Sequence, residues 1–180
     1  MTRRISIAII LLSSLFVSCA QRTAQRLQEE ISRGHALYEE RRYSEAMEAY
    51  SQAETMALKA EDYHSLGIIY QKIAHTYNAT GGHSDEIAYL DKALEAFEKA
   101  GKPYNSLHVY FEGGVARYNS QDYASAEKVF RNTMFQAHQA ADTLLEAACL
   151  EAYAALCLET SRQDPDLAIS MLARKANELK

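Results

Sequence analysis

Residues 34–62 read GHALYEERRYSEAMEAYSQAETMALKAED, and this stretch decides the fold. Two other stretches align with it without gaps: AHTYNATGGHSDEIAYLDKALEAFEKAGK from residue 74 and GVARYNSQDYASAEKVFRNTMFQAHQAAD from residue 114. The three stretches start at evenly spaced positions, 34, 74 and 114. A fixed period of this size indicates a repeat architecture, in which each unit packs only on its neighbours.

The aligned positions keep the same kinds of side chain. Each unit has a small residue, then a turn residue that is aromatic or His, then a large apolar residue; the three sets are Gly34, Ala74 and Gly114, then Tyr43, His83 and Tyr123, then Tyr50, Leu90 and Phe130. Ala46 and Ala126 also match, with Glu86 as the exception. Apolar residues recur at spacings of three and four, which predicts two helices per unit. We expect the small residue to let these helices approach closely, with the large side chain beside it.

Polar segments separate the two predicted helices of each unit. Ser44, Ser84 and Asp122 are candidate N-caps of the second helices, because their oxygens can accept hydrogen bonds from first-turn N–H groups. A fourth unit is weaker: Ala154 lies one further period along the chain, and Pro165 suits the start of a last helix, with a small shift in spacing.

This pattern resembles the tetratricopeptide repeat family. The family has a small residue in helix A, an aromatic in the turn, and Ala, a large aromatic and Ala along helix B; unit one carries all five as Gly34, Tyr43, Ala46, Tyr50 and Ala53. The resemblance covers roughly 27–180 and implies an all-α fold, an α-solenoid of about four antiparallel helix pairs in a right-handed superhelix. The implied repeats lie near 27–66, 67–106, 107–146 and 147–180. Their period is that of the longer-helix variety of the family.

The resemblance also implies a groove, lined by helix A of each unit, that binds a protein or peptide. Carried over position by position, the groove residues are His35, Tyr38, Gln71, His75, Asn78, Phe111 and Tyr118, together with Ile31, Val115, Glu151, Ala155 and Leu158. Tyr and His combine an apolar body with a polar tip, which suits protein recognition. The lining lacks the Lys/Arg pairs with which some members clamp a peptide carboxylate. The alternative is that these aromatic residues only fill space between units.

The N-terminus has the layout of a secretory signal. Residues 1–19 read MTRRISIAIILLSSLFVSC, in which two arginines precede an apolar run that is short for a membrane span. The ending Ser18-Cys19 resembles a bacterial lipoprotein signal. That resemblance implies a signal peptide over 1–18, lipidation (palmitate) at Cys19 and a lipidated linker over 19–26.

The residues around Cys19 also bear on where such a lipoprotein would go. No Asp follows the cysteine, which by the sorting rule of enteric bacteria favours the outer membrane, facing the periplasm. Phe16 stands where the lipoprotein pattern usually has Leu. Secretion without lipid and an uncleaved anchor therefore stay open.

Charge and motifs argue against nucleic-acid binding and catalysis. The chain has 19 Lys and Arg against 24 Asp and Glu, a net charge of −5, and no basic cluster that would neutralise phosphates. HExxH, GxSxG, a phosphate-binding glycine loop and CxxC are all missing from the sequence. We therefore predict a protein that is not an enzyme and uses no cofactor or metal.

The remaining His and Cys residues have structural interpretations. His35 with Glu39, and His108 with Glu112, are spaced four apart and give two ligands at most, fewer than a structural zinc site needs. We interpret them as polar pairs on a wet helix face. Cys149 and Cys157 are predicted to be packing residues, because the helix between them would span about 12 Å, which exceeds disulfide reach.

These features predict a non-catalytic interaction scaffold, tethered to the cell envelope as a lipoprotein. A second hypothesis is that the chain is the N-terminal sensory part of a larger signalling protein with a kinase or transcription-regulator module. A small-molecule accessory role, as in carbohydrate uptake, has the least support. Residues 164–180 keep several apolar side chains, so self-association through this segment is also an expectation.

Overall fold

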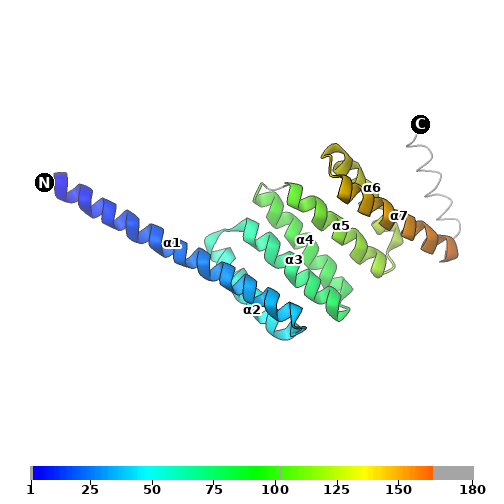
Figure 1. Cartoon of the computed structure of the whole chain (residues 1–180), viewed down its shortest axis with the longest axis horizontal. Helices are drawn as coiled ribbons and strands as arrows, with labels where there is room; N and C mark the ends of the chain where they lie inside the picture. Colours follow the sequence, from blue (N-terminus) through cyan, green and yellow to red (C-terminus); the bar gives the residue numbers. More distant parts are fainter. Residues whose placement is uncertain (1, 102, 164–180) are drawn as a thin grey trace.

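The structure is a computed structural model that describes residues 2–101 and 103–163, and these residues are built of helices without a β-strand (Figure 1). The helices are α1 (Thr2–Glu39), α2 (Tyr43–Ala60), α3 (Tyr63–Thr80), α4 (His83–Lys99), α5 (Pro103–Asn119), α6 (Tyr123–Gln139) and α7 (Thr143–Gln163). From α2 onward the helices begin at regular intervals, each half a period after the one before. One predicted period therefore corresponds to two helices with their turns, and the all-α prediction is confirmed.

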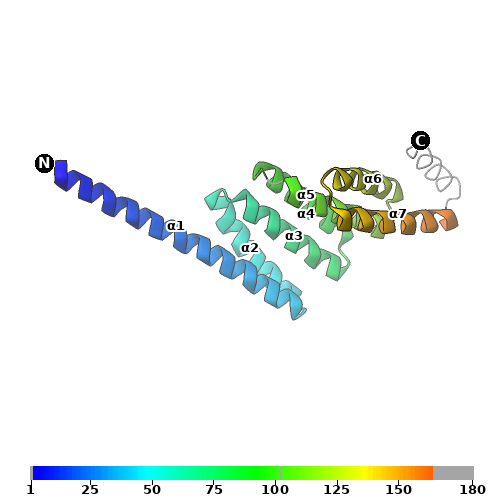
Figure 2. The same ribbon diagram turned by 45° about the horizontal axis from the view of Figure 1, so that its top comes forward.

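Helices that are neighbours in sequence pack against one another along the whole chain, from α1 on α2 to α6 on α7. The first helices of successive pairs also touch, α1 with α3 and α5 with α7. This is the solenoid-like arrangement of antiparallel pairs that the sequence predicts, and Figure 2 shows the stack from a second side. The N-terminal part of α1 extends beyond the stack (Figures 1 and 2). The predicted last helix, within 164–180, lies outside the described residues.

The turns repeat with the same period. Within each pair the chain passes through one residue of left-handed conformation, namely Arg41, Gly81 and Gln121, with φ of 61°, 80° and 65°. Between pairs the same happens at Glu61, Gly101 and Ala141, with φ of 54°, 66° and 56°. Such a residue lets the next N–H groups bond back to carbonyls of the helix end, as Gly82 N does to Tyr77 O at 2.8 Å. Only the second unit uses glycine for this conformation.

One of the three predicted N-caps is confirmed. Asp122 precedes α6, and its carboxylate accepts a hydrogen bond from Ser125 N at 3.2 Å. The predictions for Ser44 and Ser84 are wrong, because α2 and α4 begin one residue earlier and both serines lie inside the helix. The N-cap positions of α2 and α4 are Arg42 and Gly82, which make no side-chain cap, whereas the equivalent position before α6 is Asp122.

Two further caps lie between the pairs, where the sequence pattern gave no prediction. Asp62 accepts from Ser65 N at 3.0 Å at the start of α3, and Asp142 accepts from Leu145 N at 3.0 Å at the start of α7. Each occupies the position after a left-handed residue. The helices that begin a pair are therefore capped by Asp at these two places.

The expected fit of a small residue against a large one is confirmed in the core. A Cβ added to Gly34 would lie 2.5 Å from the ring of Tyr50, and one added to Gly114 would lie 2.6 Å from the ring of Phe130. In the second unit, Ala74 shares a core cluster with Leu90. Ala74 is larger than the equivalent glycines, and Leu90 is smaller than the equivalent aromatic residues. A larger side chain on the first helix is thus matched by a smaller one on the second.

Cys149 and Cys157 are free, as predicted for packing residues. Cys149 is buried in α7, and Cys157 is half-buried two turns further along. Burial raises the pKa of the Cys149 thiol to about 11, and burial also raises the pKa of Cys157. Thiols of this kind stay protonated at neutral pH and are poor nucleophiles and ligands.

Candidate functional site

The predicted groove residues lie on the first helices of the pairs. We call the surface formed by His35, Tyr38, Gln71, His75, Asn78, Phe111 and Tyr118 the first-helix face. His35 and Asn78 are exposed, and the other members are half-buried. Of the remaining predicted positions, Ile31 is buried and Val115 half-buried, whereas Glu151, Ala155 and Leu158 are exposed.

A carboxylate links two of the predicted residues at the centre of this face. The side-chain amide of Gln71 donates to both oxygens of Glu112, at 2.9 and 3.0 Å. Nε2 of His75, one turn further along α3, lies 3.1 Å from Oε2 of the same carboxylate. These bonds cross from α3 to α5, so they join the first helices of the second and third pairs.

Glu112 was missed as a member of this face. The sequence interpretation paired it with His108 on its own helix, but its carboxylate instead bonds to α3, and His108 Nε2 lies 3.4 Å from Asp142 Oδ2 at the start of α7. The period gave a partial signal: Glu112 follows Gln71 and His75 by 41 and 37 positions, so a repeat stack places the three residues on the same face of neighbouring first helices. The other pair, His35 and Glu39, lies on an exposed surface with 3.7 Å between Nδ1 and Oε1.

Tyr38 and Tyr118 both pack against the turn that follows their helix. The ring centres of Tyr38 and Tyr43 are 5.7 Å apart, and those of Tyr118 and Tyr123 are 5.8 Å apart. Burial raises the pKa of the Tyr38 phenol above its ordinary value of 10.0. The two tyrosines occupy equivalent places in the first and third units of the described stack.

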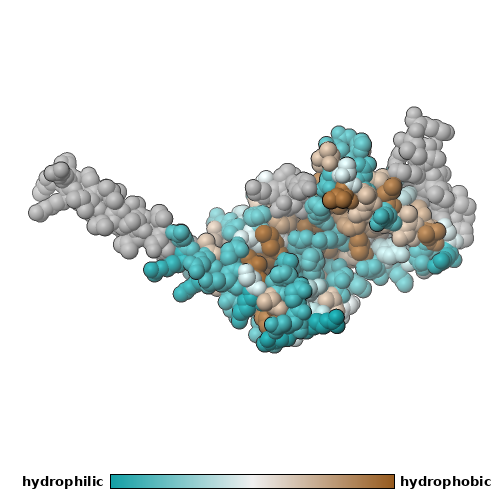
Figure 3. Space-filling model, in the orientation of Figure 1, coloured by the Kyte–Doolittle hydropathy of each residue, from teal (hydrophilic) through white to brown (hydrophobic). Residues whose placement is uncertain are grey.

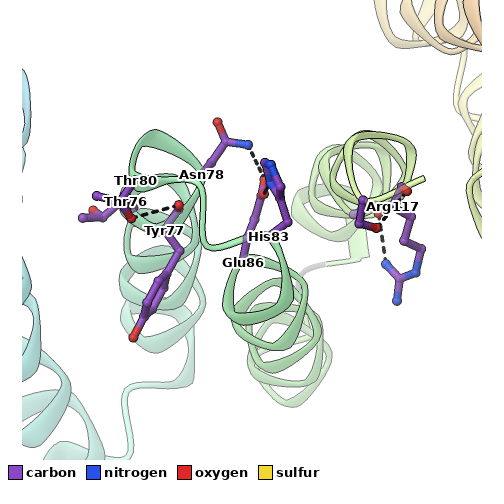
Figure 4. Close-up of polar contacts among 9 residues, drawn as sticks. Thr76, Tyr77, Asn78, Thr80, His83, Glu86 and Arg117 are labelled. Atoms are coloured by element: carbon purple, nitrogen blue, oxygen red, sulfur yellow. Dashed lines mark hydrogen bonds and ion pairs between the residues drawn. The ribbon is translucent and has the colours of Figure 1, made fainter. Parts of the chain in front are cut away.

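The equivalent place in the second unit is polar. Asn78 Nδ2 donates to Glu86 Oε1 at 2.8 Å, and His83 Nδ1 lies 3.1 Å from Glu86 Oε2 (Figure 4). The Glu86 side chain is buried, and these two partners satisfy its carboxylate. Glu86 stands where the first and third units have Ala. It is accommodated because Asn78 and His83 replace the Tyr residues of those units at two other repeat positions.

Phe111 connects neighbouring units. Its ring centre lies 5.9 Å from that of Phe130, in a tilted arrangement. It also packs beside Leu107 and Leu145, which belong to a separate cluster between α5, α6 and α7. This side chain therefore contributes to packing, and it leaves less of its ring available for a ligand.

A tyrosine cluster joins the first two pairs. The rings of Tyr77 and Tyr89 stack at 5.5 Å, and the ammonium of Lys92 lies 4.2 Å from the centre of the Tyr89 ring. The Tyr70 hydroxyl bonds to Glu54 of α2, and burial is the main cause that raises the Tyr70 pKa to about 12. The cluster stabilises the contact of α2 with α3 and α4.

The face as a whole offers amide, imidazole and phenol groups, and the Glu112 carboxylate bonds to one amide and one imidazole among them. Among the described side chains, no three His, Cys, Asp or Glu residues gather closely enough to hold a metal ion. Nor does any helix within the described ranges combine the length and apolarity needed to cross a bilayer. In space-filling view, the surface over α2 to α7 mixes hydrophilic and hydrophobic side chains (Figure 3).

These features define an all-α repeat protein, a solenoid of antiparallel helix pairs. A family model matches residues 12–106, more than half of the chain, and the chain belongs to that family, which is described as "Uncharacterized protein conserved in bacteria (DUF2225)". The match spans most of α1, all of α2, α3 and α4, and the start of α5. No curated protein matches the chain.

Proposed function

We propose that this protein is a non-catalytic interaction scaffold of tetratricopeptide repeat type that binds a protein or peptide partner on its first-helix face. The observation that carries the proposal is the alignment of first helices, with Glu112 of α5 bonded to Gln71 and His75 of α3. This alignment places the first helices of the second and third pairs side by side on one face. Aromatic, imidazole and amide groups on such a face can contact a partner by burial and hydrogen bonding without further chemistry.

The repeat assignment is supported by the packing of each unit. Gly34 against Tyr50 and Gly114 against Phe130 reproduce the small and large positions by which the family is recognised. The recurrence of left-handed turn residues at equivalent positions of successive units supports the same assignment. A bacterial origin of the family agrees with the proposal of a bacterial envelope protein.

We also propose that Cys19 carries a lipid that holds the scaffold at the outer membrane, facing the periplasm. Leu27 is buried in the core, so the packed domain begins about two helical turns after Cys19. A lipid at this position attaches the domain to a membrane surface without a spanning helix. Growth with a clickable palmitate analogue should label the wild-type protein and not the Cys19→Ala variant, and an unlabelled wild-type protein would contradict lipidation.

The binding proposal can be tested with photo-crosslinking residues placed in the full-length protein in cells. Positions 35 and 78 are exposed on the first-helix face, and Gln52 and Lys128 are exposed on the second helices as matched controls. We expect one discrete adduct from positions 35 and 78 that is missing from the controls. Adducts of equal yield at all four positions, or none on the first-helix face, would overturn the assignment.

A further inference from the structure

We infer that the turn between α2 and α3 lies on the membrane surface to which the N-terminus is attached. We call residues 58–63 and Lys99 the proximal edge. The inference rests on the proposed membrane attachment through the N-terminal segment. It adds an orientation and a second, direct contact with lipid.

The first argument is geometric. Leu27 of α1 and Ala57 of α2 share one core cluster, so the end of α2 lies beside the part of α1 that follows Cys19. From residue 19 to residue 27 a helix rises about 12 Å. In Figure 1, α1 leaves the stack next to the α2–α3 turn. Because α1 is continuous through these residues, this turn is held close to the lipid-bearing end instead of swinging on a flexible tether.

The second argument is the chemistry of the turn. Leu58 is 53% exposed and Tyr63 is 37% exposed, and both belong to the proximal edge. The turn at the opposite end of α2, residues 39–43, has a half-buried Tyr43 and no exposed large hydrophobic residue among the described side chains. An exposed leucine and an exposed tyrosine in the same turn region suit the boundary between headgroups and acyl chains.

The third argument is charge. Lys59 is exposed, and the ammonium of Lys99 lies 5.8 Å from the centre of the Tyr63 ring. Arg22 and Arg26 are exposed on the adjoining part of α1. The acidic groups of this edge are Glu61, Glu98 and Asp62, and Asp62 is engaged as the cap of α3. The four cations are placed to face an anionic lipid surface.

The chain contains no Trp, so a single introduced Trp reports on one position. Tyr63 and Tyr43 are a matched pair: each is the first residue of a helix, and they lie at opposite ends of α2, about 27 Å apart along its axis. We would purify the full-length Tyr63→Trp and Tyr43→Trp proteins from membranes. Each would be reconstituted into vesicles of phosphatidylethanolamine and phosphatidylglycerol containing a lipid with a nitroxide quencher near the headgroup.

We expect the Tyr63→Trp variant to lose most of its fluorescence to the nitroxide lipid and the Tyr43→Trp variant to keep it. A Leu58→Trp variant should be quenched as well, which guards against a local disturbance at position 63. Adding Lys59→Glu and Lys99→Glu should reduce the quenching at position 63 in anionic vesicles. Circular dichroism establishes that the variants are equally folded.

Equal quenching at positions 43 and 63, or quenching at neither in protein that stays with the vesicles, would overturn the inference and leave the attachment intact. Protein recovered in the soluble fraction without lipid would overturn the attachment, and the inference with it. Membrane fractionation before reconstitution separates these two failures.

Discussion

The hydroxyl of Tyr50 is buried, and within the described part of the chain it has no hydrogen-bond partner. An unpaired buried hydroxyl costs free energy, and the equivalent Leu90 and Phe130 carry none. We expect Tyr50→Phe to raise the free energy of unfolding by about 1 kcal/mol in urea denaturation. Tyr70→Phe is the control, since it removes a hydroxyl bonded to Glu54 and should lower stability. A destabilised Tyr50→Phe protein would show that this hydroxyl is paired after all.

The same tyrosine predicts a pH dependence. Burial raises the pKa of Tyr50 to about 12, whereas the ordinary value is 10.0. Between these values the folded protein keeps a proton that the unfolded chain loses, so stability falls as pH rises from 10 toward 12. Urea midpoints across this range should decline less steeply in Tyr50→Phe than in the wild type. If the urea midpoints of the two proteins declined in parallel, the pKa of Tyr50 would be the same in the folded and unfolded states.

The Glu86 cluster gives a third prediction at the residue scale. Glu86→Ala leaves the Asn78 amide and the His83 ring without their carboxylate partner, and it should cost about 1–2 kcal/mol of folding free energy. Asn78→Tyr and His83→Tyr, added together, convert the site to the Tyr pair and Ala of the first and third units. The triple variant should recover most of the lost stability in thermal unfolding. A further loss of stability in the triple variant would show that the residues at positions 78, 83 and 86 cannot be replaced together by those of the other units.

At the scale of elements, the units differ in which residue takes the left-handed conformation in the turn. Gln121 holds a left-handed φ of 65° that glycine adopts freely, so Gln121→Gly should stabilise the protein by up to about 1 kcal/mol despite the greater freedom of the unfolded chain. Gly81→Ala should cost about 1 kcal/mol, because a Cβ there meets nothing within 4 Å and only the backbone is strained. Denaturant midpoints of both variants test the pair. Shifts of the same sign would contradict the shared turn geometry.

The helices themselves could be predicted because the spacing of the side chains shows their period. Ala46, Tyr50 and Ala53 show the helical spacing, and the three aligned units show that it recurs. The helix starts were predicted less well: Ser44 and Ser84 suggested caps, but the N-cap positions are Arg42 and Gly82, each directly after a left-handed residue. Conformation at a non-glycine turn residue depends on the pair of helices around it, which a local pattern does not contain.

At the scale of the molecule, the stack was predictable, but the contacts across units were not. Gln71, His75 and Glu112 were each visible in the sequence, yet their meeting depends on how far α5 is displaced and rotated relative to α3. The Tyr77–Tyr89–Lys92 contacts lie within the second pair, and they depend on how α3 packs against α4. Spacing predicts which residues share a face. Which of these residues contact one another depends on the superhelical geometry, which spacing does not give.

The fit between paired helices supports the last prediction, which concerns how the stack unfolds. Gly34→Ala would press a Cβ into the Tyr50 ring and should cost about 1–3 kcal/mol. Adding Tyr50→Leu copies the Ala74 and Leu90 combination of the second unit and should restore much of the loss, giving a favourable coupling energy in a double-mutant cycle. Because repeat units contact only their neighbours, hydrogen exchange in Gly34→Ala should accelerate in α1 and α2 and stay slow in α6 and α7. Uniform acceleration from α1 to α7 would mean that the stack unfolds as one cooperative block, and its helix pairs could not then open one at a time.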